Sequence, residues 1–286
     1  MAAVAASAWG IVPMLVKRAE RSAHLDPMLE VLVLMAVMGI GAAPVMWRER
    51  RARLAVMPGS TTPWLALVVL AAAEALNVVC LFRAFRFTTV AVAMLTHNLA
   101  PVVVAVGAPL LLRERLGARA MTAAVIGCVG LAVMLRPWAA GDGARDLVGA
   151  LWGAASALCF ASVIVMNKRL SARLSGGELM CLRALLALPL LVALVPEGSW
   201  SHLTATAFLW LAIAGLGPGV AGGLLFLWGL RRIHGSHAAT LTLLEPLVAL
   251  GSAALVLDEP IGPAVLVGAA LILAGTLAVL LPRSDA

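Results

Sequence analysis

A single carboxylate interrupts one of the long apolar stretches of this 286-residue chain. Glu74 lies in the middle of the apolar run 64–82, and Asn77 follows about one helical turn later on the same face. A carboxylate at the centre of a bilayer costs at least ~2.5 kcal/mol, so Glu74 must face a wet cavity or carry a proton. The two side chains either bind the polar end of a solute, such as an ammonium group, or join neighbouring helices by hydrogen bonds.

Two prolines mark further candidate residues. His97 and Asn98 come shortly before Pro101 in one apolar run, and Glu245 directly precedes Pro246 in another. A proline inside a helix removes a backbone hydrogen bond, and freed carbonyls at broken helices commonly line transport sites. His97 either binds substrate or acts as a helix-packing donor, and Glu245 either lines the cavity or orders its kink.

Aromatic and small residues complete the candidate cavity. Trp9, Trp152 and Ser156 lie in two further apolar runs, where an aromatic face could hold a cation or an apolar side chain. A glycine-rich segment with Gly217, Pro218 and Gly219 interrupts another run. It forms a thin, flexible wall beside the substrate, or it lets helices approach closely.

The elements that position these residues are expected to be membrane helices. The chain is 63% hydrophobic and 12% charged, with a mean hydropathy of +1.03. Soluble domains are about 45–50% apolar and about 25% charged, which excludes a soluble globular domain. We predict an all-α integral membrane protein with ten transmembrane helices, in the apolar runs 2–16, 28–47, 64–82, 89–112, 118–135, 147–166, 179–195, 207–230, 237–257 and 263–281.

The charged residues set the expected orientation and exclude other functions. Lys and Arg gather between the runs, and their excess on alternate linkers predicts cytoplasmic termini in a bacterial inner membrane. The sequence has no basic footprint for nucleic acid, no cysteine or histidine spacing for a metal, and no phosphate loop for ATP. We therefore expect no enzyme activity, catalytic residue, metal or cofactor. The expected partners are a small-molecule substrate and the lipid bilayer; ten helices can form a complete carrier as a monomer, and the sequence leaves the oligomeric state open.

The chain also contains an internal repeat. A shift of 145 places 82–135 on 227–280, and it pairs Pro101 with Pro246, Glu114 with Glu259, and Gly130 with Gly275. The repeat predicts two halves, residues 1–140 and 141–286, with five spans each. Because five is odd, the second half must cross the membrane in the opposite sense. Such inverted repeats are typical of secondary transporters, whose sites lie near the midplane between the halves.

These residues resemble the drug/metabolite transporter superfamily, EamA type. The resemblance rests on Trp9-Gly10 followed by Lys17, on LLLRERL at 110–116, and on LVLDEPI and GAALILAG at 255–261 and 268–275. It implies a ten-helix exporter with a central cavity lined by helices 1, 3, 4, 6, 8 and 9, and with helices 5 and 10 at the periphery. One feature departs from the family pattern: the arginine often present in the second helix is missing, and Arg183 lies in the corresponding part of the seventh.

The favoured function is secondary transport of small metabolites, most specifically export of amino acids by alternating access. The buried carboxylate Glu74 suits a substrate that bears an amine, whereas phosphorylated substrates would need several cavity arginines or lysines. A multidrug or organic-cation exporter is the alternative. An intramembrane lipid-modifying enzyme and a scaffold without transport are weaker alternatives, because neither explains both the repeat and the polar groups within the membrane.

Overall fold

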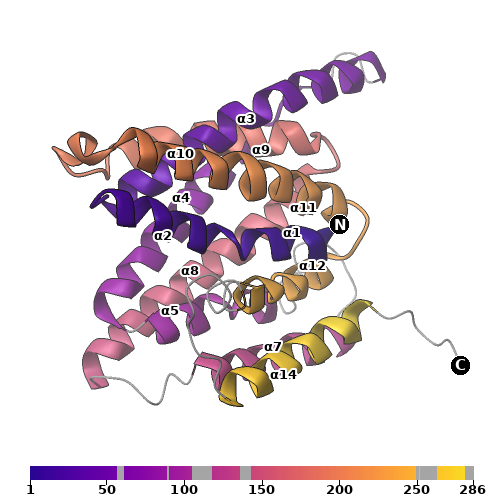
Figure 1. The fold of residues 1–286 in the computed structure, drawn as a ribbon. Coiled ribbons are helices and arrows are strands. Elements are labelled where there is room, and N and C mark those ends of the chain that lie inside the picture. Colours follow the sequence, from indigo (N-terminus) through magenta and orange to yellow (C-terminus); the bar gives the residue numbers. More distant parts are fainter. Residues whose placement is uncertain are drawn as a thin grey trace, which may run out of the picture.

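The computed structural model describes residues 1–56, 61–88, 90–104, 118–135, 143–248, 251 and 263–280, and the regular structure in these ranges is helical (Figure 1). The first half contains α1 (Ala2–Trp9), α2 (Val12–Ser22), α3 (Pro27–Val56), α4 (Trp64–Phe87), α5 (Val90–His97) and α7 (Ala118–Leu135). The second half contains α8 (Gly143–Leu170), α9 (Gly176–Val192), α10 (Ala205–Ala214), a π-helical segment (Gly215–Gly222), α11 (Gly223–Leu230), α12 (Gly235–Leu241) and α14 (Pro263–Leu280), with a 3₁₀ turn at Ser199–His202. The repeat partners Glu114 and Glu259 lie outside the described residues.

The long helices are apolar on all sides, as helices between lipid and protein must be. Among the described residues, four segments are long and apolar enough to cross a membrane: Pro27–Leu54, Trp64–Phe87, Ala144–Leu170 and Ala205–Leu230. Shorter apolar helical stretches cover Leu95–Val104, Met121–Val133 and Leu266–Gly275. The chain is therefore a multi-pass helical membrane protein.

Two helical runs are broken just before a proline. The helix containing α5 has a turn at Asn98 and Leu99, before Pro101, and the helix after α12 begins beyond a turn at Thr242. The Leu99 N–H donates to the Thr96 carbonyl, and the Thr242 N–H donates to that of Ala239, so both turns use the tighter three-residue spacing. Each proline lacks the N–H that would continue an α-helix.

The first apolar run differs from its prediction. Instead of one short helix over residues 2–16, the chain forms α1 and α2, separated by a turn at Gly10 and Ile11. Helix α2 continues through the basic residues to Ser22. Lys, Arg and Glu are good helix formers, so the end of the apolar stretch does not end the helix.

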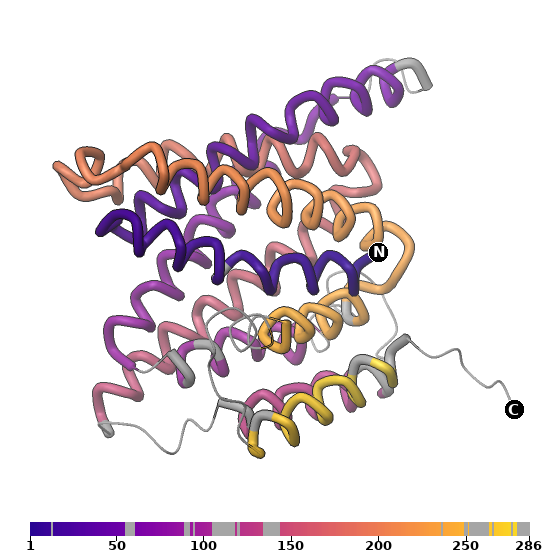
Figure 2. Tube along the Cα trace, in the orientation of Figure 1, coloured from indigo at the N-terminus to yellow at the C-terminus, as the bar shows by residue number. Residues whose placement is uncertain are grey.

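Close helix contacts are made where glycines replace side chains. Helices α7 and α14 lie side by side at one edge of the bundle (Figure 1 and Figure 2). A Cβ at Gly130 would stand 2.7 Å from the Gly268 carbonyl oxygen, and one at Gly275 would stand 2.7 Å from that of Ala123. The two glycines that the repeat pairs therefore lie in one interface, each facing the backbone of the other helix.

Candidate functional site

Glu74, the candidate carboxylate, forms a buried ion pair. Arg183 of α9 points its Nη1 at Glu74 Oε2 of α4, at 3.4 Å, and the side chains are only 10% and 12% exposed, respectively. The Arg183 Nη2 also approaches the Met180 sulfur at 3.7 Å. The carboxylate that the sequence analysis treated as single thus has a cationic partner. The pair is longer than the usual 2.7–3.2 Å of an N–H···O bond, so it is weakly engaged.

A second polar group joins three helices. Ser156 of α8 donates its hydroxyl to Asn77 of α4, at 2.7 Å from Oδ1 and 3.0 Å from the backbone carbonyl. The Nδ1 of His97, at the end of α5, lies 2.8 Å from the same Ser156 oxygen. The His97 ring stacks on Phe160 with centroids 5.3 Å apart. Three candidates named separately from the sequence therefore form one buried hydrogen-bonding group.

The proline-linked candidates differ in their surroundings. Asn98 is 8% exposed, and its carbonyl accepts from the Cys128 thiol at 3.4 Å, which gives a partner to a carbonyl in the turn before Pro101. Glu245 is half-buried, and its backbone N–H donates to the Thr242 carbonyl at 2.9 Å. Among the described residues, its side chain joins neither polar group. Pro246 itself is buried.

The two tryptophan candidates contact different parts of the bundle. Trp9 packs on Phe226 of α11, with centroids 5.0 Å apart, and lies against Gly222, where a Cβ would be 3.1 Å from its Nε1. Trp152 lies under the guanidinium of Arg83, 5.3 Å from the ring centroid. Trp9 therefore lines the α1–α11 contact, whereas Trp152 belongs to the end of the bundle where α4 ends.

The glycine-rich segment is π-helical and packs closely on one side. A Cβ at Gly219 would lie 3.0 Å from Met38 of α3, whereas one at Gly217 would meet nothing within 4 Å. Pro218 lies inside the segment. A π-helix has i→i+5 hydrogen bonds and is rare in proteins. Gly217 is exposed, so the segment combines a packed face with an open one.

A further charged group, which has no counterpart among the sequence candidates, holds the start of α9. Arg53 donates to both oxygens of Glu178, at 2.9 and 2.8 Å, and the Glu178 side chain is fully buried. Glu178 also forms a capping box with Ser175 at the start of α9. Arg50 approaches the same carboxylate at 4.0 Å but is 40% exposed.

Glu49 extends this group to a third helix. Its Oε2 accepts from the Gly177 N–H at 2.6 Å, and its Oε1 accepts from the Trp228 indole N–H at 3.0 Å. We call the group the Glu178 cluster; its members are Glu49, Arg53, Gly177, Glu178 and Trp228. The cluster ties the ends of α3 and α11 to the start of α9. Ser175 with Glu178 was the available sequence signal, since this spacing is typical of a capping box.

Comparisons with known proteins agree with this arrangement. Residues 1–136 and 147–281 match the model of the EamA-like transporter family. A protein from Archaeoglobus fulgidus, described as an uncharacterized transporter, is 30% identical over 215 residues, which cover 74% of this chain and 74% of the relative. A crystal structure at 19% identity superposes with a TM-score of 0.80 over 98% of this chain and 96% of the other, which shows the same fold.

Proposed function

The chain belongs to the EamA-like transporter family, and on that premise we propose that it is a secondary exporter of amino acids with apolar side chains. It would act by alternating access around the Glu74–Arg183 pair. The transporter class follows from the family; the substrate and mechanism are the proposal.

Several observations support an architecture of ten spans in two inverted halves. The family matches fall on 1–136 and 147–281, close to the proposed halves 1–140 and 141–286. Helix breaks precede both Pro101 and Pro246, and Gly130 and Gly275 share one interface. Two halves of opposite sense can exchange conformations, which is the basis of alternating access.

The proposed location is a bacterial inner membrane, with both termini in the cytoplasm. The basic linkers favour this orientation, which also puts the Glu178 cluster at the cytoplasmic end. The end of α4 then faces the outside. This arrangement is consistent with α3 and α4 running in opposite directions in Figure 1.

The Glu74–Arg183 pair is the observation that carries the substrate assignment. A free carboxylate would favour an organic cation, but Arg183 would repel it. A zwitterion can give its ammonium to Glu74 and its carboxylate to Arg183, so that both charges remain matched. Because the two side chains are 3.4 Å apart, the substrate can replace their mutual contact more easily than it could replace a short, bidentate pair. An amino acid therefore fits the pair better than a multidrug cation does.

Transport by the reconstituted protein tests this proposal. Proteoliposomes are loaded with unlabelled L-phenylalanine or L-leucine, and counterflow of the radiolabelled amino acid is measured beside uptake of tetraphenylphosphonium. We expect amino-acid counterflow in the wild type. Glu74→Gln and Arg183→Gln should each lower it about tenfold or more, since a charge-assisted hydrogen bond contributes about 1.5–3 kcal/mol.

The double variant separates recognition from packing. Glu74→Gln with Arg183→Gln leaves no buried charge unpaired, so a purely structural pair would recover transport in the double variant. We expect transport to stay low although the protein elutes as the wild type does in size-exclusion chromatography. Recovery of counterflow would contradict the recognition role, and transport of tetraphenylphosphonium alone would favour the cation exporter.

A further inference from the structure

A separate cavity lies at the end of the bundle where α4 ends. Its volume is about 520 Å³, within the 300–1,000 Å³ typical of small-molecule sites. Its wall comes from the end of α2, the start of α3, the last two turns of α4 and the segment after α9. We call it the α4-end cavity. None of the sequence candidates lines it.

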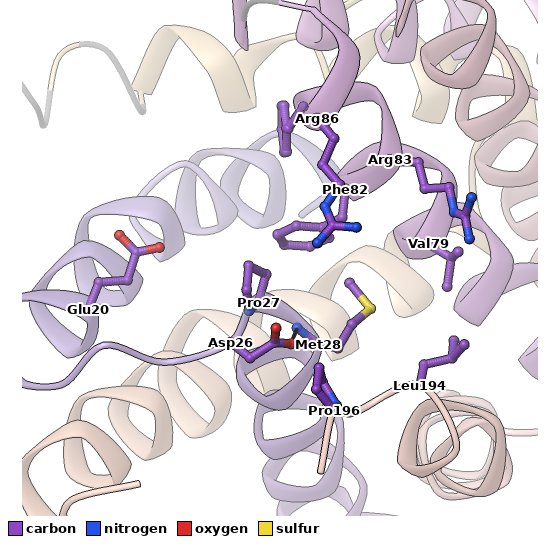
Figure 3. Close-up of a pocket in the computed structure, with 11 residues that line it drawn as sticks. Glu20, Asp26, Pro27, Met28, Val79, Phe82, Arg83, Arg86, Leu194 and Pro196 are labelled. Atoms are coloured by element: carbon purple, nitrogen blue, oxygen red, sulfur yellow. Dashed lines mark hydrogen bonds between the residues drawn. The ribbon is translucent and has the colours of Figure 1, made fainter. Parts of the chain in front are cut away.

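Charges of opposite sign lie on different walls of this cavity. Glu20 and Asp26 come from α2 and the turn before α3, whereas Arg83 and Arg86 come from the end of α4 (Figure 3). Among the described residues, no ion pair joins the two acidic side chains to the two arginines. The walls therefore present an anionic and a cationic surface to one cavity, which is open to the outside at Glu20, Arg83 and Arg86.

Local structure holds two of these side chains, those of Asp26 and Arg83, in position. Asp26 Oδ1 accepts from the Met28 N–H at 2.8 Å, which fixes the carboxylate at the start of α3. The Arg83 guanidinium lies over the Trp152 ring at 5.3 Å from its centroid. Arg83 and Arg86 are three residues apart on α4, so they share one face of the helix. The charged walls are built into the helix ends.

Two phenylalanine rings also line the cavity, beside its charged walls. Phe82 and Phe85 line the cavity and meet edge to face, with centroids 5.7 Å apart and planes at 88°. In Figure 3 the Phe82 ring lies between Arg86 and Pro27. A ligand that spans the acidic and basic walls would place its apolar part against these rings.

We propose that the α4-end cavity is a second binding site, which takes a zwitterionic amino acid with an apolar side chain. The arginines bind the carboxylate, the acidic side chains bind the ammonium, and the two phenylalanines contact the side chain. This inference rests on the proposed function and adds a second substrate-binding site to it. Glu74 and Phe82 are eight residues apart on α4, or about 12 Å along the helix, so the cavity lies beyond the central pair on the same helix.

A phosphatidylethanolamine headgroup shares the chemistry of this ligand, because it also joins an anion to an ammonium group. The volume and the phenylalanine pair favour the free amino acid, whose apolar part would contact the rings while its charges contact the walls. The two sources are distinguished by varying the lipid around the full chain.

Binding is measured in a background that lacks the central pair. The Glu74→Gln/Arg183→Gln protein is placed in nanodiscs of phosphatidylglycerol, and radiolabelled L-phenylalanine is bound in a scintillation proximity assay. We expect one molecule to bind per chain, with phenethylamine and 3-phenylpropionate competing at least about tenfold more weakly, because each lacks one charge. No binding in this background, or equal competition by phenethylamine, would overturn the proposal.

Variants of the two walls complete the test. On the same background, Arg86→Gln and Glu20→Gln should each weaken binding about tenfold, whereas Arg231→Gln, an exposed arginine after α11, should leave it unchanged. Addition of phosphatidylethanolamine should not displace L-phenylalanine. Displacement by this lipid would show that the headgroup is the occupant and would overturn the amino-acid assignment. Transport that persists without this binding rejects the second site alone, whereas absence of wild-type counterflow rejects the proposed function alone.

Discussion

Two cavities of almost equal volume lie at opposite ends of the bundle and differ in charge. The α4-end cavity measures about 520 Å³, and the other, lined by Pro44, Val45, Arg48, Glu49 and Trp228, measures about 530 Å³. In the second cavity, Glu49 is already bound to a backbone N–H and an indole N–H. In the first, charged walls of both signs face the cavity without an ion pair between them among the described residues.

This difference shows that volume alone does not identify a ligand site. Near the Glu178 cluster, the carboxylates are satisfied by the protein itself, so they hold helices together. At the α4 end, a helix cap holds Asp26 and the Trp152 ring lies under Arg83, whereas Glu20 and Arg86 are exposed. The Glu178 cluster, by contrast, joins α3, α9 and α11.

The largest effect is expected from breaking the Glu178 cluster. Arg53→Gln leaves the fully buried Glu178 carboxylate without its bidentate partner, which should destabilise the protein by about 3 kcal/mol. The midpoint of thermal unfolding in detergent measures this loss. Arg50→Gln is the matched control, since this exposed residue approaches the same carboxylate at 4.0 Å and should cost less than about 0.5 kcal/mol. Equal losses for the two variants would contradict the assignment of Arg53 as the main partner.

A smaller loss of stability is expected from overpacking a helix contact than from removing a charged partner. Gly153 of α8 faces Thr96 of α5 so closely that a Cβ would collide with the threonine hydroxyl. Gly153→Ala should therefore cost about 1–3 kcal/mol through overpacking, as measured by thermal unfolding. Gly217→Ala is the control, because nothing lies within 4 Å of that Cβ, and it should change stability by less than about 0.5 kcal/mol. A neutral Gly153→Ala would show that α5 and α8 can separate at no cost.

A third variant weakens the cluster without removing a charge. Trp228→Phe removes the indole N–H that Glu49 accepts at 3.0 Å, and the expected loss is about 1.5 kcal/mol. Unfolding of Trp200→Phe, which alters a 54% exposed tryptophan, supplies the comparison and should stay close to wild type. A loss for Trp228→Phe no larger than that control would mean that Glu49 is held by Gly177 alone.

The smallest change in stability is expected at the α4 end. Arg86 is exposed and forms no ion pair among the described residues, so Arg86→Gln should shift the unfolding free energy by less than about 0.5 kcal/mol. On the Glu74→Gln/Arg183→Gln background, the same substitution should nevertheless weaken L-phenylalanine binding about tenfold. A large loss of stability would remove the distinction between the two ends.

The sequence predicts the helical membrane class well and the partners of its polar residues poorly. Asn77, His97 and Ser156 could each be identified as a polar residue in an apolar run. Whether they form hydrogen bonds with one another depends on the relative depth of α4, α5 and α8. Hydropathy does not determine that depth. The Glu74 partner was missed for the same reason, since Arg183 follows 109 residues later on a helix of unspecified rotation.

Two other features were misread or overlooked for local reasons. The segment from Arg48 to Arg53 was interpreted as a linker, yet α3 continues to Val56, because arginine, glutamate and alanine are good helix formers. Its charges therefore have fixed places on a helix. The spacing of Gly149 and Gly153 is the small-xxx-small pattern of close helix contacts, and it could have predicted the α5–α8 packing.

The Ser156 hydroxyl fixes the tautomer of His97. A hydroxyl has one proton, and Ser156 gives it to Asn77, so the oxygen can only accept from His97. The neutral imidazole therefore carries its hydrogen on Nδ1, 2.8 Å from that oxygen, and leaves Nε2 as a lone-pair acceptor. Nitrogen-15 chemical shifts of labelled histidine should show the Nδ1–H form, and Ser156→Ala should shift the ring towards the Nε2–H form common in free imidazoles. One serine thus determines which edge of the ring can receive a proton.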